Sequence, residues 1–239
     1  MAYDYLFFGD SFTYGEDAET VDDTWPAQYL SMIGKTDSVY KNCAQRGQSN
    51  SGILLDVLQV IDDRAVIDSN TVVFIGLSNI FRDATGVSVR ADAGQASYWY
   101  QDVNYNTANA HVSKPWDKML AEYSRYFSLE HEKILAAKNF SYYITINDIL
   151  DRIGCTCYLV DVLFDCKYVQ DLLSLGDHFF EDVISFGGRG GIVKYIRDHY
   201  PDIKDTASHH FDKTGYGLMA ELIHNEMHDF KQLNTRKNR

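Results

Sequence analysis

Proline and interdomain linkers are scarce in this sequence. Only 3 prolines occur among 239 residues, and no stretch rich in serine, glycine and proline divides the chain. We therefore expect a single domain over residues 1–239, a length that is ordinary for one α/β domain. Hydrophobic residues make up 45% of the chain and charged residues 23%, so the composition is globular rather than disordered.

Positive charge is also in short supply. The chain has 22 Lys and Arg against 34 Asp and Glu, which gives a net charge of −12. Affinity for nucleic acid depends on a basic surface that neutralises phosphates. The sequence therefore predicts neither a nucleic acid nor an anionic membrane as a partner.

Long apolar runs are missing as well. None approaches the roughly 18 residues of a membrane-spanning helix. Residues 1–4 carry no basic segment, and the apolar run behind them is too short for a secretory signal. We expect a cytoplasmic protein, or one carried on a phage particle or released by lysis.

Cysteine is limited to four residues, and their spacing indicates no metal site. Cys155 and Cys157 are separated by one residue, which is not the spacing of a zinc or redox pair. We expect all four thiols to be reduced and structural, since free cysteine is commonly buried like a small hydrophobe. Neither a metal nor a cofactor is expected.

Short apolar segments alternate with segments of helical periodicity. The expected strands are Tyr5–Phe8, 38–43, 71–75 and 157–164, and the expected helices are 25–34, 51–61, 116–152, 192–199 and 215–231. Within 116–152 we expect a break near Ser128 or Asn139. Strands that alternate with helices pair in parallel through crossover connections, which predicts an α/β protein.

Residues 84–115 interrupt this alternation. The part from 96 to 112 is rich in tyrosine, tryptophan, asparagine and glutamine, without clear periodicity. We expect a loop insertion here, and long loops of this kind are uncommon unless functional. Exposed aromatic and amide side chains suit contact with a carbohydrate or a peptide, whereas the alternative is a loop packed down on the domain.

Four short segments place reactive or hydrogen-bonding groups after the expected strands. Ser11 ends a Gly-Asp-Ser turn, Gly47 and Asn79 can offer N–H donors, and His210 precedes the last helix. A serine, an imidazole base and preorganised N–H donors are the minimum set for acyl transfer. The carboxyl ends of parallel strands bring such loops together. The segments read Gly9-Asp10-Ser11, Asn42 to Asn50 around Gly47, Gly76-Leu77-Ser78-Asn79, and His210-Phe211-Asp212-Lys213-Thr214-Gly215-Tyr216.

In their order and spacing these segments resemble the conserved blocks of the SGNH, or GDSL, hydrolase family of esterases, lipases, thioesterases and carbohydrate O-acetyl esterases. The resemblance implies a flavodoxin-like three-layer α/β/α sandwich with a central parallel sheet. It also implies that Ser11 is the nucleophile and His210 the base. The N–H groups of Ser11 and Gly47 and the amide of Asn79 would form the oxyanion hole.

One position departs from the family's pattern. The family usually carries an aspartate three residues before the catalytic histidine, and here that position is Ala207. The nearest upstream acid is Asp205, and registering the motif on His209 instead puts Thr206 at the acid's place. Asp205 could reach the imidazole by another path, a backbone carbonyl or a distant acid could orient it, or the site could have lost its acid.

The sequence thus predicts a serine esterase that hydrolyses an acyl or acetyl ester, on a carbohydrate in the favoured version. Its catalytic residues would be Ser11, His210 and Asp205. The alternative is a catalytically weakened protein of the same fold that binds a glycan or has a structural role, and Ala207 favours it. The oligomeric state is left open.

Overall fold

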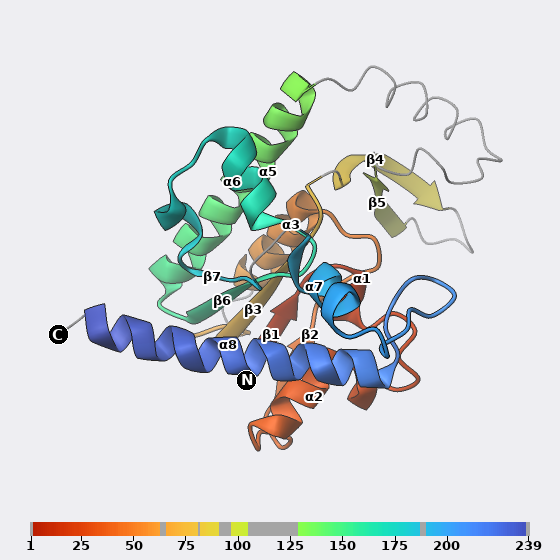
Figure 1. The fold of residues 1–239 in the computed structure, drawn as a ribbon, viewed down its shortest axis with the longest axis vertical. Coiled ribbons are helices and arrows are strands. Elements are labelled where there is room, and N and C mark those ends of the chain that lie inside the picture. The colour runs from red at the N-terminus through yellow and green to blue at the C-terminus, as the bar shows by residue number, and fades with distance from the viewer. Residues whose placement is uncertain are drawn as a thin grey trace.

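The computed structural model describes residues 2–62, 66–80, 82–90, 97–104, 129–186 and 190–237. At its centre lies a sheet of five parallel strands in the order β2-β1-β3-β6-β7 (Figure 1). Counted within this sheet alone, the order is 2-1-3-4-5, which is that of flavodoxin-like folds. The expected α/β class with a parallel sheet is confirmed. The strands are β1 Tyr5–Phe8, β2 Tyr40–Asn42, β3 Val72–Leu77, β6 Thr156–Asp161 and β7 Val183–Ile184.

Helices cover both faces of this sheet, which gives three layers (Figure 1). One face is covered by α3, α5 and α6, and the other by α2, α7 and α8. The helices are α1 Ser11–Tyr14, α2 Trp25–Met32, α3 Asn50–Asp62, α5 Leu129–Ile153, α6 Cys166–Leu173, α7 Gly191–His199 and α8 Lys213–Lys237, with 3-10 turns η1 Val21–Asp23 and η2 Asp177–Phe180. Among the described residues, no helix is both long and apolar enough to cross a membrane.

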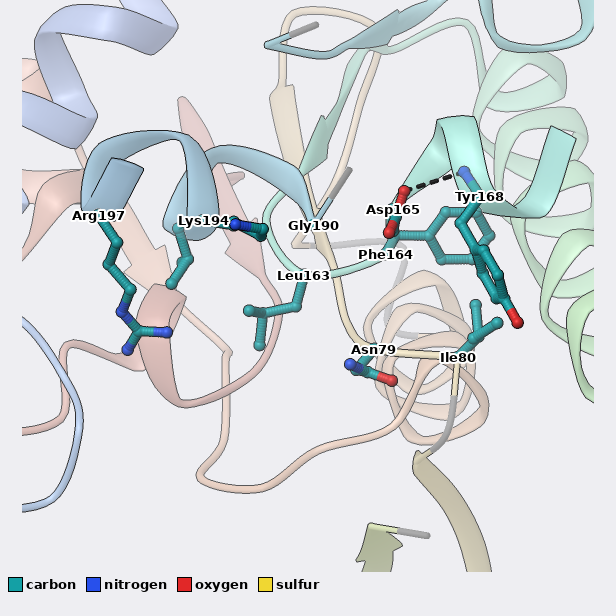
Figure 2. A pocket seen from close by; sticks show the side chains of 10 residues that line it. Asn79, Ile80, Leu163, Phe164, Asp165, Tyr168, Gly190, Lys194 and Arg197 are labelled. Carbon is teal, nitrogen blue, oxygen red and sulfur yellow. Dashed lines mark hydrogen bonds between the residues drawn. The ribbon is translucent and has the colours of Figure 1, made fainter. Parts of the chain in front are cut away.

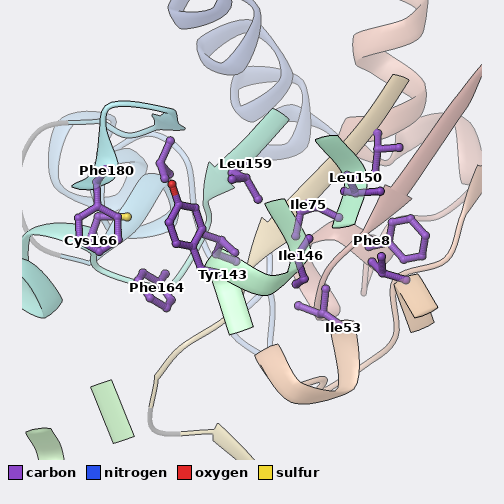
Figure 3. Close-up of a cluster of buried hydrophobic side chains, with 14 of the residues drawn as sticks. Phe8, Ile53, Ile75, Tyr143, Ile146, Leu150, Leu159, Phe164, Cys166 and Phe180 are labelled. Carbon is purple, nitrogen blue, oxygen red and sulfur yellow. The ribbon is translucent and has the colours of Figure 1, made fainter. Parts of the chain in front are cut away.

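Successive residues of the central strands point to opposite layers, as the two-residue period of a strand requires. In β1, Leu6 and Phe8 belong to the core beneath α3 and α5, whereas Phe7 belongs to the core beneath α2 and α8. Figure 3 shows the first core, where Phe8 and Ile75 meet Ile53 of α3. Strands buried on both faces read as continuous apolar runs, and for this reason the sequence revealed them.

The second core is rich in aromatic rings. Phe7 stacks on Phe74 with ring centroids 5.0 Å apart, and it meets Trp25 edge to face with centroids 5.4 Å apart. Trp25 is fully buried. These contacts pack α2 against β1 and β3. The Gly-Asp-Ser turn follows β1, and the segment with Asn79 follows β3.

The prediction of a loop at 84–115 is wrong for the part of that range that the structure describes. Strands β4 (Arg82–Arg90) and β5 (Ser97–Asn104) pair antiparallel in a separate sheet. The register sets Val87 opposite Tyr100 and Val89 opposite Tyr98. The rest of the expected insertion, 91–96 and 105–115, lies outside the described residues.

Helix α5 continues through Asn139, so the second of the two positions at which we expected a break does not hold. The Asn139 amide donates to the carbonyls of Leu135, one turn earlier, and of Ile80. Its polar group is therefore satisfied inside the protein, and the helix continues past it. The expected start of this helix at 116, and the break near Ser128, fall outside the described residues.

Candidate active site

The Gly-Asp-Ser turn directly follows β1, and Ser11 is the first residue of α1. Asp10 is fully buried and caps this short helix, because its carboxylate accepts the N–H of Phe12 at 3.1 Å. Its other oxygen accepts the hydroxyl of Ser78, beyond the end of β3, at 3.1 Å. Asp10 thus ties the nucleophile turn to the neighbouring strand and serves a structural purpose.

Two glycines let α1 approach the sheet. A Cβ at Gly9 or at Gly76 would collide with the side-chain hydroxyl of Thr13. Only residues without a side chain fit at both positions, which explains glycine in each of the two motifs. The close approach fixes Ser11 at the carboxyl edge of the sheet.

His210 reaches the serine from the loop before α8. Its Nε2 lies 2.8 Å from Ser11 Oγ, and its ring packs 4.7 Å from that of Phe12. The structure thus brings together the two residues that the sequence singled out as nucleophile and base. The neighbouring His209 has a left-handed backbone, with φ 65°, and makes no such contact in the described chain.

The other ring nitrogen of His210 faces a hydroxyl rather than a carboxylate. Its Nδ1 lies 3.3 Å from Ser208 Oγ. Ser208 and Thr206 both donate hydrogen bonds to the carboxylate of Asp17. These bonds, that from Ser208 first, lower the pKa of Asp17 from its ordinary value, so Asp17 is ionised at neutral pH.

Asp205 does not hydrogen-bond the imidazole, which corrects the expectation that it orients His210. Its two carboxylate oxygens accept hydrogen bonds from Arg197 at 3.0 and 3.1 Å. Arg197 also donates to the carbonyl of His209 at 2.7 Å. A bridge between Asp205 and Phe211 closes the loop. Asp205 therefore helps to hold the shape of the histidine loop and leaves the ring to other partners.

Among the described residues, neither the backbone N–H of Ser11 nor that of Gly47 hydrogen-bonds to an acceptor. Ser11 is only 2% exposed, and its N–H belongs to the first residue of a helix, which has no partner within that helix. Gly47 has φ 69°, and a Cβ there would meet nothing within 4 Å. The left-handed backbone at this position, rather than a lack of room for a side chain, therefore explains why residue 47 is glycine.

A buried amide network, which the sequence did not reveal, supports the segment that carries Asn79. The Asn50 amide donates to the Ser78 carbonyl and to Asn139 Oδ1, both at 2.8 Å, and the Ser78 N–H donates back to Asn50 at 2.8 Å. Asn139 in turn donates to the Ile80 carbonyl at 3.1 Å. The carbonyls on both sides of Asn79 are thereby fixed. The available signal was an asparagine on the apolar stripe of a long helix.

A second acid missed at the sequence level lies on the serine side of the imidazole. Glu16 Oε2 is 3.6 Å from His210 Nε2, and Glu16 Oε1 is 3.6 Å from Arg46 Nε. The buried Tyr216 donates its hydroxyl to the Glu16 carbonyl at 2.7 Å. The Gly215-Tyr216 pair of the C-terminal motif thus anchors the turn that follows the nucleophile.

A cleft of about 210 Å³ lies between α6, α7 and the segment that carries Asn79. Figure 2 shows Lys194 and Arg197 of α7 on one side, Tyr168 of α6 on the other, and Asn79 between them. Neither Ser11 nor His210 lines this cleft, and its links to the candidate site are Asn79 and Arg197. The apolar part of the wall comes from Ile80, Leu163, Phe164 and Val193.

Within the described part of the chain, no group of three or more His, Cys, Asp or Glu residues could hold a metal ion. The arrangement instead offers a hydroxyl hydrogen-bonded to an imidazole, the N–H groups of Ser11 and Gly47, and a small cleft that Asn79 lines. A hydroxyl in that setting can be deprotonated as it attacks a carbonyl.

No family model and no curated sequence matches this chain. Solved structures do match. TesA superposes with a TM-score of 0.53 at 10% identity, over 95% of this chain and 98% of its own. A member of the lipolytic protein G-D-S-L family from Veillonella parvula DSM 2008 gives a TM-score of 0.51 at 13% identity, over 91% and 94%. An acetyl xylan esterase, AlAXEase, gives 0.50 at 15% identity, over 92% and 98%.

These matches extend over nearly the whole of each chain, and at such low identity they report on the fold. They agree with the resemblance seen in the four sequence segments. The chain has the α/β fold of the GDSL, or SGNH, esterases and lipases.

Proposed function

We propose that the protein is a serine esterase of SGNH type that hydrolyses a small acyl or acetyl ester. The observation that carries the proposal is the 2.8 Å contact between His210 Nε2 and Ser11 Oγ. A nucleophile and a base within hydrogen-bond reach are the diagnostic feature of covalent acyl transfer.

In the proposed reaction, Ser11 Oγ attacks the ester carbonyl while His210 Nε2 takes the hydroxyl proton. The tetrahedral intermediate collapses as His210 returns this proton to the departing alcohol, which leaves an acyl group on Ser11. Water, deprotonated by His210, then releases the carboxylic acid and restores the serine. The sequence of bonds is that of serine hydrolases in general.

The negative charge on the intermediate needs donors that are already in place. We assign this function to the N–H groups of Ser11 and Gly47 and to the amide of Asn79. The absence of acceptors for the first two within the described chain supports the assignment. Removing one such donor typically costs about 3 kcal/mol of transition-state stabilisation.

We further propose that the acyl group of the ester binds in the cleft that Asn79 lines, which favours a short acyl group. The cleft volume of about 210 Å³ is below the roughly 300–1,000 Å³ of pockets that hold drug-sized ligands. An acetyl group on a carbohydrate is the substrate we favour, and one of the structures of similar fold is named an acetyl xylan esterase. The alternative, a glycan-binding protein with a weakened site, is favoured by Ala207 alone.

Hydrolysis of p-nitrophenyl acetate tests the proposal. We expect the wild type to turn over this ester, Ser11→Ala and His210→Ala to fall to background, and an exposed serine variant, Ser31→Ala, to match the wild type. A longer octanoate ester should be a poorer substrate because the cleft is small. Equal, near-background rates for the wild type and Ser11→Ala would refute the proposal and favour the binding protein.

A further inference from the structure

We propose that Asp17, acting through the hydroxyl of Ser208, replaces the aspartate missing at position 207 and orients His210. Asp17 and Ser208 are positioning residues in this account, because neither touches the substrate. The relay presupposes the proposed function, since it prepares His210 to act on Ser11.

The proton count along the chain of hydrogen bonds selects one tautomer of His210. A serine hydroxyl has a single proton, and Ser208 donates it to the carboxylate of Asp17. Its oxygen can then only accept from His210 Nδ1, which lies 3.3 Å away, so Nδ1 must carry the ring proton. Nε2 is left with a free lone pair directed at Ser11 Oγ, as a general base requires.

Asp17 reaches this position through an unusual backbone conformation. It follows the end of α1, where Gly15 has φ 84°, and Asp17 itself has φ 68°. Left-handed backbone is uncommon outside glycine, and aspartate is among the residues that tolerate it best. The turn that carries Ser11 therefore also carries the acid, and the histidine loop needs to supply only the bridging hydroxyl.

Thr206 links the carboxylate of Asp17 to the loop that carries His210. Its hydroxyl donates to the Asp17 carboxylate and accepts the backbone N–H of His210 at 3.2 Å. The carboxylate is thus held by two donors from one loop, while Asp205 is engaged by Arg197 on the other side of that loop. Among the described residues, the hydroxyl of Ser208 is the only one within hydrogen-bond distance of His210 Nδ1. The ionised acid that contacts this hydroxyl is Asp17.

Both Asp17 and Ser208 are exposed, so water screens the relay more than it screens a buried acid. A neutral substitute for a buried triad acid lowers kcat about 10⁴-fold. We expect a smaller loss here, on the order of 10-fold in kcat for Asp17→Asn or Ser208→Ala, with little change in KM.

The test is a double-mutant cycle on ester hydrolysis with Asp17→Asn, Ser208→Ala and the double variant. A relay predicts that the double variant is no slower than either single variant, because each already breaks the chain. Asp37→Asn, an exposed acid elsewhere, is the matched control and should keep the wild-type rate. Ala207→Asp in the Asp17→Asn background should restore kcat, since it returns an acid to the family's usual position.

Two results would overturn the relay while Ser11 remains essential for hydrolysis. One is wild-type kcat in both single variants, and the other is losses that multiply in the double variant. A readout independent of activity is the ¹⁵N NMR spectrum of His210, for which we expect the Nδ1–H tautomer in the wild type. An Nε2–H tautomer would contradict the relay, whereas hydrolysis that does not need Ser11 would remove the proposed function itself.

Discussion

At the scale of single residues, the site depends on where protons and charges are held. Ser11 and His210 meet because the segment that carries each of them is held in place. Ser11 follows β1, and His210 lies in a loop that Arg197 holds by a hydrogen bond to the carbonyl of His209. Asp10, buried beneath the serine, shapes the turn and leaves the chemistry to its neighbour. Charged groups therefore act here mainly by holding loops in place.

The carboxylate of Asp23, in the 3-10 turn before α2, should have a measurable effect on the free energy of unfolding. Asp23 accepts hydrogen bonds from Lys213 at 2.8 Å and from the Thr20 hydroxyl at 2.8 Å, and these bonds lower the pKa of Asp23. A lowered pKa adds stability above the unfolded value of about 3.9, and this stability is lost as pH falls through the lower folded value.

Asp23→Asn should therefore be less stable than the wild type at pH 7, and the difference should close as pH falls below about 4. Urea unfolding at a series of pH values measures it. The neighbouring exposed acid variant, Asp22→Asn, is the control and should show a smaller difference. A gap between wild type and Asp23→Asn that is constant with pH would contradict the assignment.

The residue scale also shows what sequence can and cannot reveal. The meeting of Ser11 and His210 was predictable because local motifs mark both residues. Asp17 was not, since it acts on a loop 191 residues away through a hydroxyl. Asp205 was misassigned because closeness in sequence says nothing about the arginine that engages it.

At the scale of elements, the segment after β3 is held by helices rather than by its own turn. Asn50 at the start of α3 and Asn139 within α5 fix the carbonyls on both sides of Asn79. Strands β1, β3 and β6 were predictable as short apolar runs, and most helices from their apolar period, whereas the two-residue strand β7 was not predicted. The sequences of β4 and β5 are polar and aromatic and lack such a period, so the sequence alone predicts a loop there.

Asn139→Ala should loosen this segment. It leaves the Ile80 carbonyl and an Asn50 N–H without their partner in a buried setting, which costs about 1–3 kcal/mol of unfolding free energy. We expect kcat for ester hydrolysis to fall as well, because Asn79 loses its support. Asn147→Ala on the same helix controls for helix propensity and should change both quantities little; a stable, fully active Asn139→Ala would contradict the role of the network.

At the scale of the whole molecule, both cores share the strands of one sheet. Leu6 and Phe8 enter one core while Phe7 enters the other, so disturbance of either core reaches the same strands. This coupling supports the expectation of one domain. It also explains how the site, at the edge of the sheet, receives rigid support from two sides.

Trp25→Ala should test that coupling. Removal of a fully buried indole beneath α2 costs about 3–5 kcal/mol. Far-UV and near-UV circular dichroism should report the same shifted urea transition, because both cores unfold together. Met32→Ala, at a position that is 44% exposed on the same helix, should stay within about 0.5 kcal/mol of the wild type; two separate transitions in Trp25→Ala would contradict a shared core.

The most direct test of the central claim, that His210 activates Ser11 as a nucleophile, is labelling of the intact protein by a fluorophosphonate. Mass spectrometry of the wild type should show one adduct, and peptide mapping should place it on Ser11. Ser11→Ala should take up no label, and His210→Ala should label far more slowly. A wild type that stays unlabelled, or that carries the label on another residue, would contradict the account.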